Sequence, residues 1–332
     1  MKTEIKPFSA EMIPLAGNLL SARHKRNRAK LSLLPERFED STVAGKAVEA
    51  LWQKKFKNGY AAFRDGKMTA YLIGDFTVQP WGRCGYVYLA GYALEEGESL
   101  KTLQDLYSLL GEDWVQKGVF SHSLYISAAD ADVIDALFAL GFGKERVDAL
   151  LDLGIAEIAE PAAPANIDIR IAGTGDNSRL GDLSHVIMES LANAPYWHPT
   201  IPEDWEELRE GWAELADDQE WTVWLALEKE KALATVGFRP EEEQETAMLV
   251  SPRTVYLSIA ATLPQARGRG ISTALTLCGL KQVQKEGFNI CYTNWISPNL
   301  PASRFWPRFG FKDAAYRLAK RIDPMIAWTK QR

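Results

Sequence analysis

The sequence is poor in cysteine and histidine. Among its 332 residues are only four histidines and three cysteines, Cys84, Cys278 and Cys291. The cysteines form no Cys-x-x-Cys pair and no even disulfide set, which predicts a reducing, cytoplasmic setting. Four scattered histidines lack the spacing of a structural zinc site, so we expect no bound metal.

Long apolar runs and an excess of positive charge are also missing. No stretch approaches the roughly 18–20 apolar residues of a membrane span, and the opening MKTEIKPFSAEM lacks the apolar centre of a signal peptide. The formal net charge is −6, whereas a broad nucleic-acid surface needs a basic face. We therefore expect neither a membrane nor a nucleic-acid partner. With 46% hydrophobic and 25% charged residues, the composition is that of a globular protein.

The chain is long enough for two domains. Residues 154–166 are rich in Ala, Pro and Glu, have no aromatic residue, and follow an apolar strand-like run. This composition is typical of a linker. We expect one domain over 1–153 and a second over 167–332. The alternative is a short helix and loop inside a single domain.

Hydrophobic periodicity predicts a similar order of elements in both halves. In the second half, strands are expected over 167–171, 221–227, 232–238, 254–261, 290–293 and 315–321, and helices over 176–194, 203–215, 272–285 and 298–310. In the first half, strands are expected over 2–6, 60–64, 67–76, 86–94, 123–127 and 147–153, and helices over 11–27, 41–57, 99–116 and 132–140. The two halves thus share one topology, which is not that of a short solenoid repeat.

A glycine-bearing turn joins an expected strand to the helix that follows it. It lies within 263–272, Leu-Pro-Gln-Ala-Arg-Gly-Arg-Gly-Ile-Ser. Such a turn presents unpaired backbone N–H groups at the positive end of the helix dipole, an arrangement that suits a pyrophosphate. Gly268 and Gly270 allow close approach of a ligand, and Arg267 and Arg269 add positive charge. The alternative is a tight connection with solvated arginines.

A second segment, Asn299 to Phe311, follows the next expected strand. Together the two segments resemble the acyl-CoA-binding motifs of the GCN5-related N-acetyltransferase (GNAT) superfamily, R/Q-x-x-G-x-G/A and N-x-x-A-x-x-x-Y-x-x-x-G-F. The first motif fits in two registers, starting at Gln265 or at Arg267. We prefer Arg267, because Pro264 stands three residues before it, as in the family. In the second motif Asn299, Ala302, Gly310 and Phe311 match, whereas Trp306 holds the tyrosine position.

The resemblance implies an α/β (α+β) fold of two tandem GNAT-like domains, each with a mixed, mostly antiparallel central sheet flanked by helices. It implies acetyl-CoA as the acyl donor. The cofactor-binding residues carried over are Ala260, Ala261, Thr262, Arg267, Gly268, Arg269, Gly270, Ile271, Ser272, Asn299, Ser303 and Trp306. The implied reaction is direct attack of a primary amine on the CoA thioester. Trp306 cannot deliver a proton as a phenol does.

The first half shares the order of elements but lacks the first motif. Glu95-Glu96-Gly97-Glu98-Ser99 stands where the glycine turn would be, and its three carboxylates would repel a pyrophosphate. We interpret residues 1–153 as a degenerate GNAT-like domain. The basic run 23–28 in this half is interpreted as a solvated helix end rather than an anion site.

The catalytic base cannot be read from the sequence, because the expected strand 254–260 has no Asp or Glu. Tyr256 and Asn294 are the catalytic candidates, with Glu189 or His198 as bases acting through water. Tyr196, Trp197 and His198 are candidate substrate-binding residues, because the connection that carries them covers the acceptor site in GNAT folds. The acceptor is expected to be a small-molecule or peptide amine, and the protein a monomer or homodimer.

The same two segments are compatible with two other classes of protein. A non-catalytic acyl-CoA-binding or sensor protein is the main alternative, because Trp306 replaces the tyrosine acid and the strand lacks a carboxylate. A dinucleotide-binding protein is disfavoured by the missing G-x-G-x-x-G and the missing acidic residue about 20 positions later.

Overall fold

The computed structural model describes residues 3–79 and 82–330, and its contacts divide the chain into two compact units. Unit 1 comprises Met1–Asp148, Glu243–Ser251 and Asp313–Arg332. Unit 2 comprises Ala149–Glu242 and Pro252–Lys312. The units therefore do not coincide with the two halves of the sequence, since two segments of the second half belong to unit 1.

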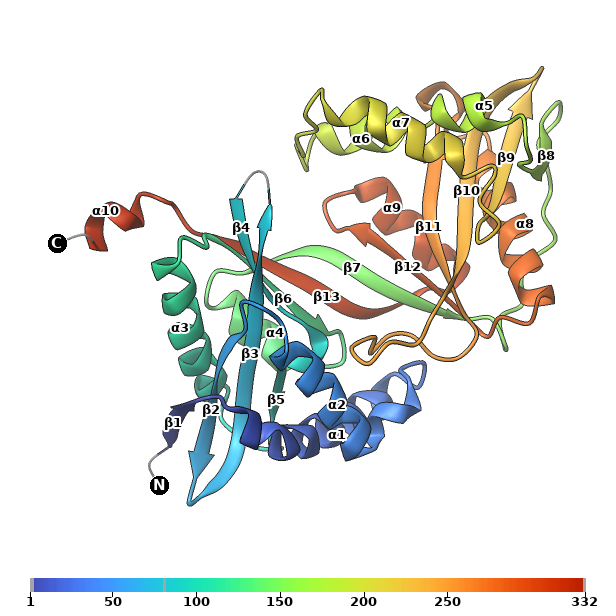
Figure 1. The fold of residues 1–332 in the computed structure, drawn as a ribbon. Coiled ribbons are helices and arrows are strands. Elements are labelled where there is room, and N and C mark those ends of the chain that lie inside the picture. Colours follow the sequence, from blue (N-terminus) through green and yellow to red (C-terminus); the bar gives the residue numbers. More distant parts are fainter. Residues whose placement is uncertain (1–2, 80–81, 331–332) are drawn as a thin grey trace. The chain divides into compact units, whose positions relative to one another are not determined.

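Unit 1 is built on a mixed sheet with helices on both faces (Figure 1). Its helices are α1 (Ile13–Lys30), α2 (Ser41–Trp52), α3 (Leu100–Gln116), α4 (Ala131–Phe138) and α10 (Ile326–Lys330). Its strands are β1 (Glu4–Pro7), β2 (Asn58–Arg64), β3 (Lys67–Gln79), β4 (Gly82–Val87), β5 (Tyr92–Leu94), β6 (Ser121–Ser127), most of β7 (Gly143–Asp152) and β13 (Lys312–Arg321). The strand order is β1-β2-β3-β4-β6-β13-β7, and β5 pairs with β3 off this path.

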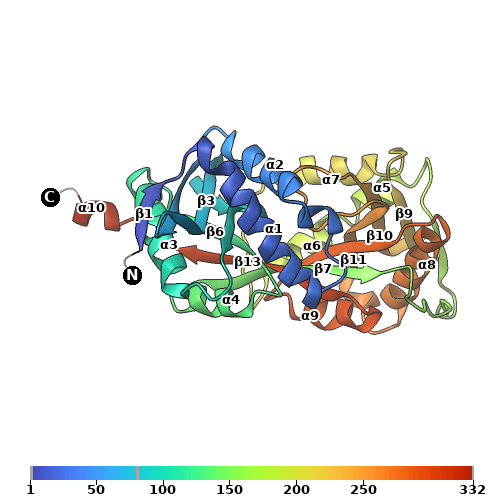
Figure 2. The same cartoon turned by 90° about the horizontal axis from the view of Figure 1, so that it is seen from below.

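Two hydrophobic cores hold these layers together. The larger core packs α3 and α4 against the sheet around Trp114, Leu106 and Leu124. The other packs α1 and α2 around Phe38, Leu20 and the ring of Tyr71. Figure 2 shows the same arrangement, with α1 and α2 separated from α3 and α4 by the strands of the sheet.

Unit 2 has its own sheet, ordered β12-β11-β10-β9-β8 with the end of β7 beside β12. Its strands are β8 (Asp168–Ile171), β9 (Thr222–Glu228), β10 (Lys231–Glu241), β11 (Thr254–Thr262) and β12 (Ile290–Ile296). Its helices are α5 (Asn177–Gly181), α6 (His185–Ala192), α7 (Asp204–Glu214), α8 (Ile271–Lys285) and α9 (Leu300–Phe305). Helix α8 packs on β9, β10 and β11, and Gly279 makes this possible because a Cβ there would lie 2.2 Å from the ring of Phe238.

The last strand of the second half completes the sheet of unit 1. Residues Ala315–Arg321 of β13 pair antiparallel with Ser127–Ser121 of β6. The loop before β11 likewise contributes to unit 1, where Met248 is buried in the α1–α2 core and Arg37 forms an ion pair with Glu243. Glu241 ends β10, and residues 242–245 of this loop are exposed.

Two expected elements are interrupted in the structure. The helix expected over 176–194 is divided into α5 and α6, because α5 packs tightly on α7 at Gly181 and the Ser184 hydroxyl donates back to the Gly181 carbonyl at 2.7 Å. The strand expected over 86–94 is divided into β4 and β5 by a turn of 3-10 helix, Leu89–Gly91. The other predicted elements are found within a few residues of their expected ends.

The predicted linker, residues 154–166, contains no helix or strand and lies along α8. The Gln284 side chain donates to the carbonyls of Leu153 (2.6 Å) and Ala156 (3.1 Å), and Glu160 forms an ion pair with Lys281. Pro164 reaches the start of the helix at Gly270. Within the described residues, no helix has both the length and the apolarity to cross a membrane.

Two buried histidines of unit 1 predict acid sensitivity. Burial lowers the pKa of His24 and of His122 to about 4, although hydrogen bonds to the carbonyls of Pro35 and Val119 act in the opposite direction. In the unfolded chain an imidazole titrates near 6.5, so between pH 6.5 and 4 the unfolded state binds more protons. We expect the free energy of unfolding to fall as the pH drops through this window, by up to about 1.4 kcal/mol per pH unit and histidine.

Urea unfolding at pH 7, 5.5 and 4.5 measures this slope. The His24→Asn and His122→Asn variants should each have a shallower slope than the wild type. A free energy of unfolding that stays constant from pH 6.5 to 4.5 would contradict the assignment.

Candidate active site

The site in unit 2 begins where β11 and β12 separate. Their parallel pairing joins Thr254–Leu257 to Ile290–Thr293 and ends there, although β11 continues to Thr262 and β12 to Ile296. On its other edge β11 has a bulge, since Gly237 pairs with Ile259 and Phe238 with Leu257, leaving Ser258 as the extra residue. From Ser258 onward, the edge of β11 that faces β12 is therefore open to a ligand.

The turn between β11 and α8 has the conformation that an anion site needs. Gly268 (φ 76°) and Gly270 (φ 79°) both adopt the left-handed region, where a side chain would be strained. Gly270 is the N-cap of α8 and no side chain caps the helix. The first intrahelical bond, from Ala274 N–H to the Gly270 carbonyl, leaves the N–H groups of residues 271–273 available.

The two arginines of this turn differ in their contacts. Arg269 donates to the Glu228 carboxylate at 2.6 Å, and this hydrogen bond raises the pKa of Arg269 and lowers that of Glu228. Arg267 has only a long hydrogen bond, 3.3 Å, to the Thr262 carbonyl, and it lines the cavity described next. Arg267 is thus the arginine that is free to meet an anion.

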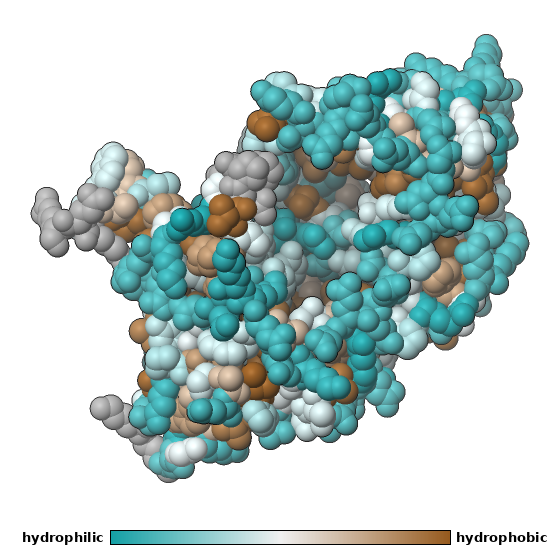
Figure 3. Space-filling view, viewed as in Figure 1, coloured by the Kyte–Doolittle hydropathy of each residue, from teal (hydrophilic) through white to brown (hydrophobic). Residues whose placement is uncertain are grey.

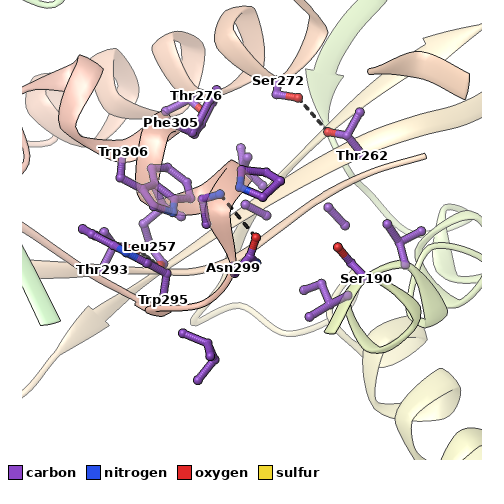
Figure 4. Close-up of a pocket in the computed structure, with 18 of the residues that line it drawn as sticks. Ser190, Leu257, Thr262, Ser272, Thr276, Thr293, Trp295, Asn299, Phe305 and Trp306 are labelled. Atoms are coloured by element: carbon purple, nitrogen blue, oxygen red, sulfur yellow. Dashed lines mark hydrogen bonds between the residues drawn. The ribbon is translucent and has the colours of Figure 1, made fainter. Parts of the chain in front are cut away.

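A cavity of about 370 Å³ occupies the gap between the two strands (Figure 4). Its walls come from the open ends of β11 and β12, from β10 and α6, and from α8 and α9. Seven of the predicted cofactor residues line it: Ala260, Ala261, Thr262, Arg267, Ser272, Asn299 and Trp306. Gly268, Arg269, Gly270 and Ile271 form the adjoining turn. Ser303 is not among the described residues that line the cavity, and its hydroxyl donates to the Ser297 carbonyl at 3.0 Å.

Several cavity residues were missed by the sequence reasoning. Ser190 of α6, Thr276 of α8, Thr293 of β12 and Phe305 of α9 all line the cavity. None belongs to a recognisable motif position. Thr276 could have been found as the residue one helical turn after Ser272 on the same face of α8.

The two predicted catalytic residues lie side by side, but only one reaches the cavity. Asn294 lines it and donates through Nδ2 to the Tyr256 hydroxyl. The Tyr256 ring stacks on Tyr292 at 4.9 Å between centroids. Tyr256 is thus positioned to orient the Asn294 amide.

The predicted substrate-binding residues lie on the loop between α6 and α7. Tyr196 lines a second cavity of about 350 Å³, which shares Ser190, Arg267 and Asn299 with the first. Trp197 is 68% exposed and has a left-handed backbone (φ 51°). His198 is exposed, with its ring 5.4 Å from that of Tyr196.

Charge is distributed unevenly around these cavities. Among the described residues, Arg267 is the one charged residue that lines the first cavity, and Arg267 and Glu189 both line the second. Residues 203–220, which include α7, hold nine carboxylates and one arginine, a net charge of −8 in a chain of net charge −6. Figure 3 shows hydrophilic side chains over this part of unit 2. In the described part of the chain, no three His, Cys, Asp or Glu side chains are grouped as metal ligands would be.

In unit 1 the corresponding gap is filled by the protein itself. The pairing of β4 with β6 ends at Val87 and Leu124, and β5 joins β3 instead. Arg23 donates to the carbonyls of Leu89 (2.8 Å) and Tyr92, with its guanidinium 3.9 Å from the Tyr92 ring centroid. The Tyr92 hydroxyl donates to Asp130 at 2.7 Å and accepts from Ser127 N–H at 3.1 Å.

The interpretation of residues 23–28 as a solvated helix end is therefore wrong. Arg23, His24 and Asn27 are 2–4% exposed, and Arg26 donates to the Leu94 carbonyl at 2.9 Å. The side chains of Arg23 and Arg26 donate hydrogen bonds to these carbonyls because the interrupted strand leaves them without partners in the sheet.

A carboxylate stands at the start of α3 in unit 1. Glu98 accepts from Ser99 N–H (2.8 Å), Thr102 (3.0 Å) and Arg64 (2.7 Å), and its side chain is 1% exposed. Burial alone would raise the pKa of this carboxyl, but the hydrogen bonds outweigh burial and lower the pKa. The N-terminus of α3 thus already holds an anion, whereas that of α8 does not.

Comparison with known proteins agrees with this geometry. Residues 187–311 match the family model described as Acetyltransferase (GNAT) family. No curated protein matches the chain significantly. A GCN5-related N-acetyltransferase from Sphaerobacter thermophilus superposes with a TM-score of 0.59 at 17% identity, over 97% of this chain and 96% of its own.

Two further solved structures share the fold. A tandem GNAT protein from the clavulanic acid biosynthesis pathway has a TM-score of 0.54 at 13% identity, over 96% of this chain and 98% of its own. A glucosamine N-acetyltransferase region of a fungal multi-domain β-N-acetylglucosaminidase has a TM-score of 0.56 at 15% sequence identity. This superposition covers 96% of this chain and 38% of that chain. The chain therefore has the fold of a tandem GNAT protein, as the sequence predicted. The family model matches residues 187–311 of the chain, and the general chemistry of that family is acyl-CoA-dependent acetyl transfer.

The self-filled gap of unit 1 leads to a stability prediction. Arg23→Met would leave the carbonyls of Leu89 and Tyr92 without their donors, at about 1–3 kcal/mol for each buried unpaired group. We expect the variant to lose at least about 2 kcal/mol of unfolding free energy. Lys25→Met, at an exposed position of the same helix, is the matched control and should change little. The free energy of unfolding of both variants is measured with a denaturant. Equal values for Arg23→Met and Lys25→Met would show that Arg23 is dispensable for stability.

Proposed function

We propose that unit 2 is an acetyl-CoA-dependent N-acetyltransferase that transfers the acetyl group to a primary amine. The observation that carries this proposal is the opening between β11 and β12 with the uncapped start of α8 at its mouth. An extended acyl thioester with an anionic head group needs both features. The opening between the strands would take the thioester end, and the start of α8 would take the anionic end.

The residues present fit acetyl-CoA as the donor. The free N–H groups of residues 271–273 and the Arg267 guanidinium suit the pyrophosphate. The open backbone edge of β11 from Ser258 to Thr262 suits the amides of the pantetheine arm, because it offers donors and acceptors like those of a missing strand. A backbone N–H at this edge would polarise the thioester carbonyl for attack by the amine.

Proton transfer must proceed without a carboxylate in the first cavity, because its lining contains no Asp, Glu or His. We propose that Asn294, oriented by Tyr256, positions the amine or a water beside it. Glu189, in the adjoining cavity, would take the amine proton through water. The thiolate leaves readily without a strong acid, because thiol pKa values lie near ~8.5.

The acceptor is proposed to be a cationic small-molecule or peptide amine bound beside Tyr196, Trp197 and His198. The acidic segment 203–220 supports this choice, since a negative field attracts a cation to the mouth of the site. We propose that unit 1 binds no CoA in this manner, because Arg23 and Glu98 occupy the corresponding positions. The three free cysteines are in keeping with a cytoplasmic enzyme.

Binding of acyl-CoA without turnover is the second candidate. Trp306 favours it, because it is buried among Phe305, Phe309 and Phe311 at the position where the family has its tyrosine. Release of free thiol from acetyl-CoA in the presence of an amine panel separates the two functions.

The two arginines of the turn provide a test of the donor site. Arg267→Ala should weaken CoA binding about ten-fold, because a charge-assisted bond to a phosphate contributes about 1.5–3 kcal/mol. Arg269→Ala should change the affinity much less, because its guanidinium is already paired with Glu228. Isothermal titration of both variants with CoA gives the comparison. The placement of the pyrophosphate would be refuted if Arg269→Ala weakened CoA binding more than Arg267→Ala, or if neither variant changed the affinity for CoA.

Position 306 provides a test of turnover. Trp306→Tyr should keep CoA affinity and should raise thiol release or leave it unchanged, because a phenol is a better proton donor than an indole. Phe309→Tyr, on the same helical turn, controls for a general effect of an added hydroxyl. Thiol release is followed with a chromogenic disulfide at saturating acetyl-CoA. A large loss of turnover in Trp306→Tyr alone would mean that the indole itself contacts the substrates.

A further inference from the structure

Thr276 is a fully buried residue of α8 on the wall of the first cavity. Its relative exposure is 0%, and Figure 4 draws it among the side chains that line the cavity. Its hydroxyl has no hydrogen-bond partner among the described residues. A threonine within a helix commonly bonds the carbonyl of the preceding turn, so this unpaired oxygen is unusual for its position.

Four of the other hydroxyls at this wall have partners. Thr262 and Ser272 bond each other at 2.7 Å, Thr293 donates to the Leu257 carbonyl at 2.9 Å, and Thr235 donates to the Trp224 carbonyl at 2.8 Å. A buried hydroxyl without a partner destabilises the protein. Thr276 is therefore a polar group that the folded chain leaves unsatisfied at the cavity.

We infer that the Thr276 hydroxyl hydrogen-bonds an amide of the pantetheine arm, an inference that rests on the proposed acyl-CoA site. Thr276 lies one helical turn beyond Ser272, about 6 Å further along α8 from the phosphate turn. That displacement takes it past the pyrophosphate to the part of the ligand that carries amides. The hydroxyl can serve either an amide carbonyl or an amide N–H, because it both donates and accepts.

The experiment compares two ligands and two variants. Thr276→Val removes the hydroxyl at nearly constant volume, and Thr276→Ser keeps it. CoA carries the pantetheine arm and 3′,5′-ADP lacks it. Dissociation constants for both ligands are measured on the full chain by isothermal titration, with competition for the weaker ligand, and the unfolding temperature is measured without ligand.

We expect Thr276→Val to bind CoA about ten-fold more weakly while its affinity for 3′,5′-ADP is unchanged. Thr276→Ser should retain CoA affinity within about three-fold. The ligand-free valine variant should unfold at the wild-type temperature or higher, because it no longer buries an unpaired hydroxyl. A merely structural role for Thr276 predicts the opposite change in unfolding temperature.

Three results would overturn the inference. They are an unchanged CoA affinity in Thr276→Val, an equal loss for both ligands, or a loss in Thr276→Ser as large as in Thr276→Val. A wild-type protein that binds neither ligand would overturn the proposed function, and the role of Thr276 with it. Since a failure specific to Thr276 leaves wild-type CoA binding intact, the two failures are distinguishable.

Discussion

The separation of β11 from β12 is the constraint on which the rest of the site depends. A sheet interior normally pairs every backbone group, so a gap must be built and then lined. The bulge at Ser258 begins the separation, and Gly237 permits it on the neighbouring strand, since a Cβ there would lie 3.3 Å from the Trp221 ring. The backbone groups that no longer pair with β12 become the walls of the cavity.

The gap between two neighbouring strands is filled in unit 1 and open in unit 2. In unit 1 the unpaired carbonyls are satisfied by Arg23 and Arg26, and the start of α3 is occupied by the Glu98 carboxylate. In unit 2 the start of α8 has glycine and no capping side chain, and the gap remains an open cavity. Unit 1 differs in the 3-10 turn that divides β4 from β5 and in the side chains that satisfy the polar groups at this gap.

Local signals in the sequence predicted the elements and the glycine turn before α8, because periodicity, Gly268 and Gly270 act over a few residues. The insertion of β13 beside β6 could not be predicted, since the alternating pattern of 315–321 identifies a strand and not its neighbour. Arg23 was misread for the same reason. A basic residue in a helix is usually solvated, and the carbonyls that bury it belong to Leu89 and Tyr92, more than 60 residues away in the chain. Thr276 belongs to no motif, and its unpaired hydroxyl is a property of packing alone.

The distribution of charge limits how the site can use an amine. An alkyl ammonium must lose a proton before it attacks, at about 4–5 kcal/mol for a pKa near ~10.4 at pH 7. The carboxylates of 203–220 favour the charged form outside, whereas the first cavity is lined by Arg267 and by no carboxylate, which disfavours that form inside. Under the proposed function, a cationic amine that enters the first cavity would therefore lose its proton more readily than it does in water. Under the proposed function, this change of environment would do part of the work of a general base, and Glu189, which lines the second cavity, would receive the proton.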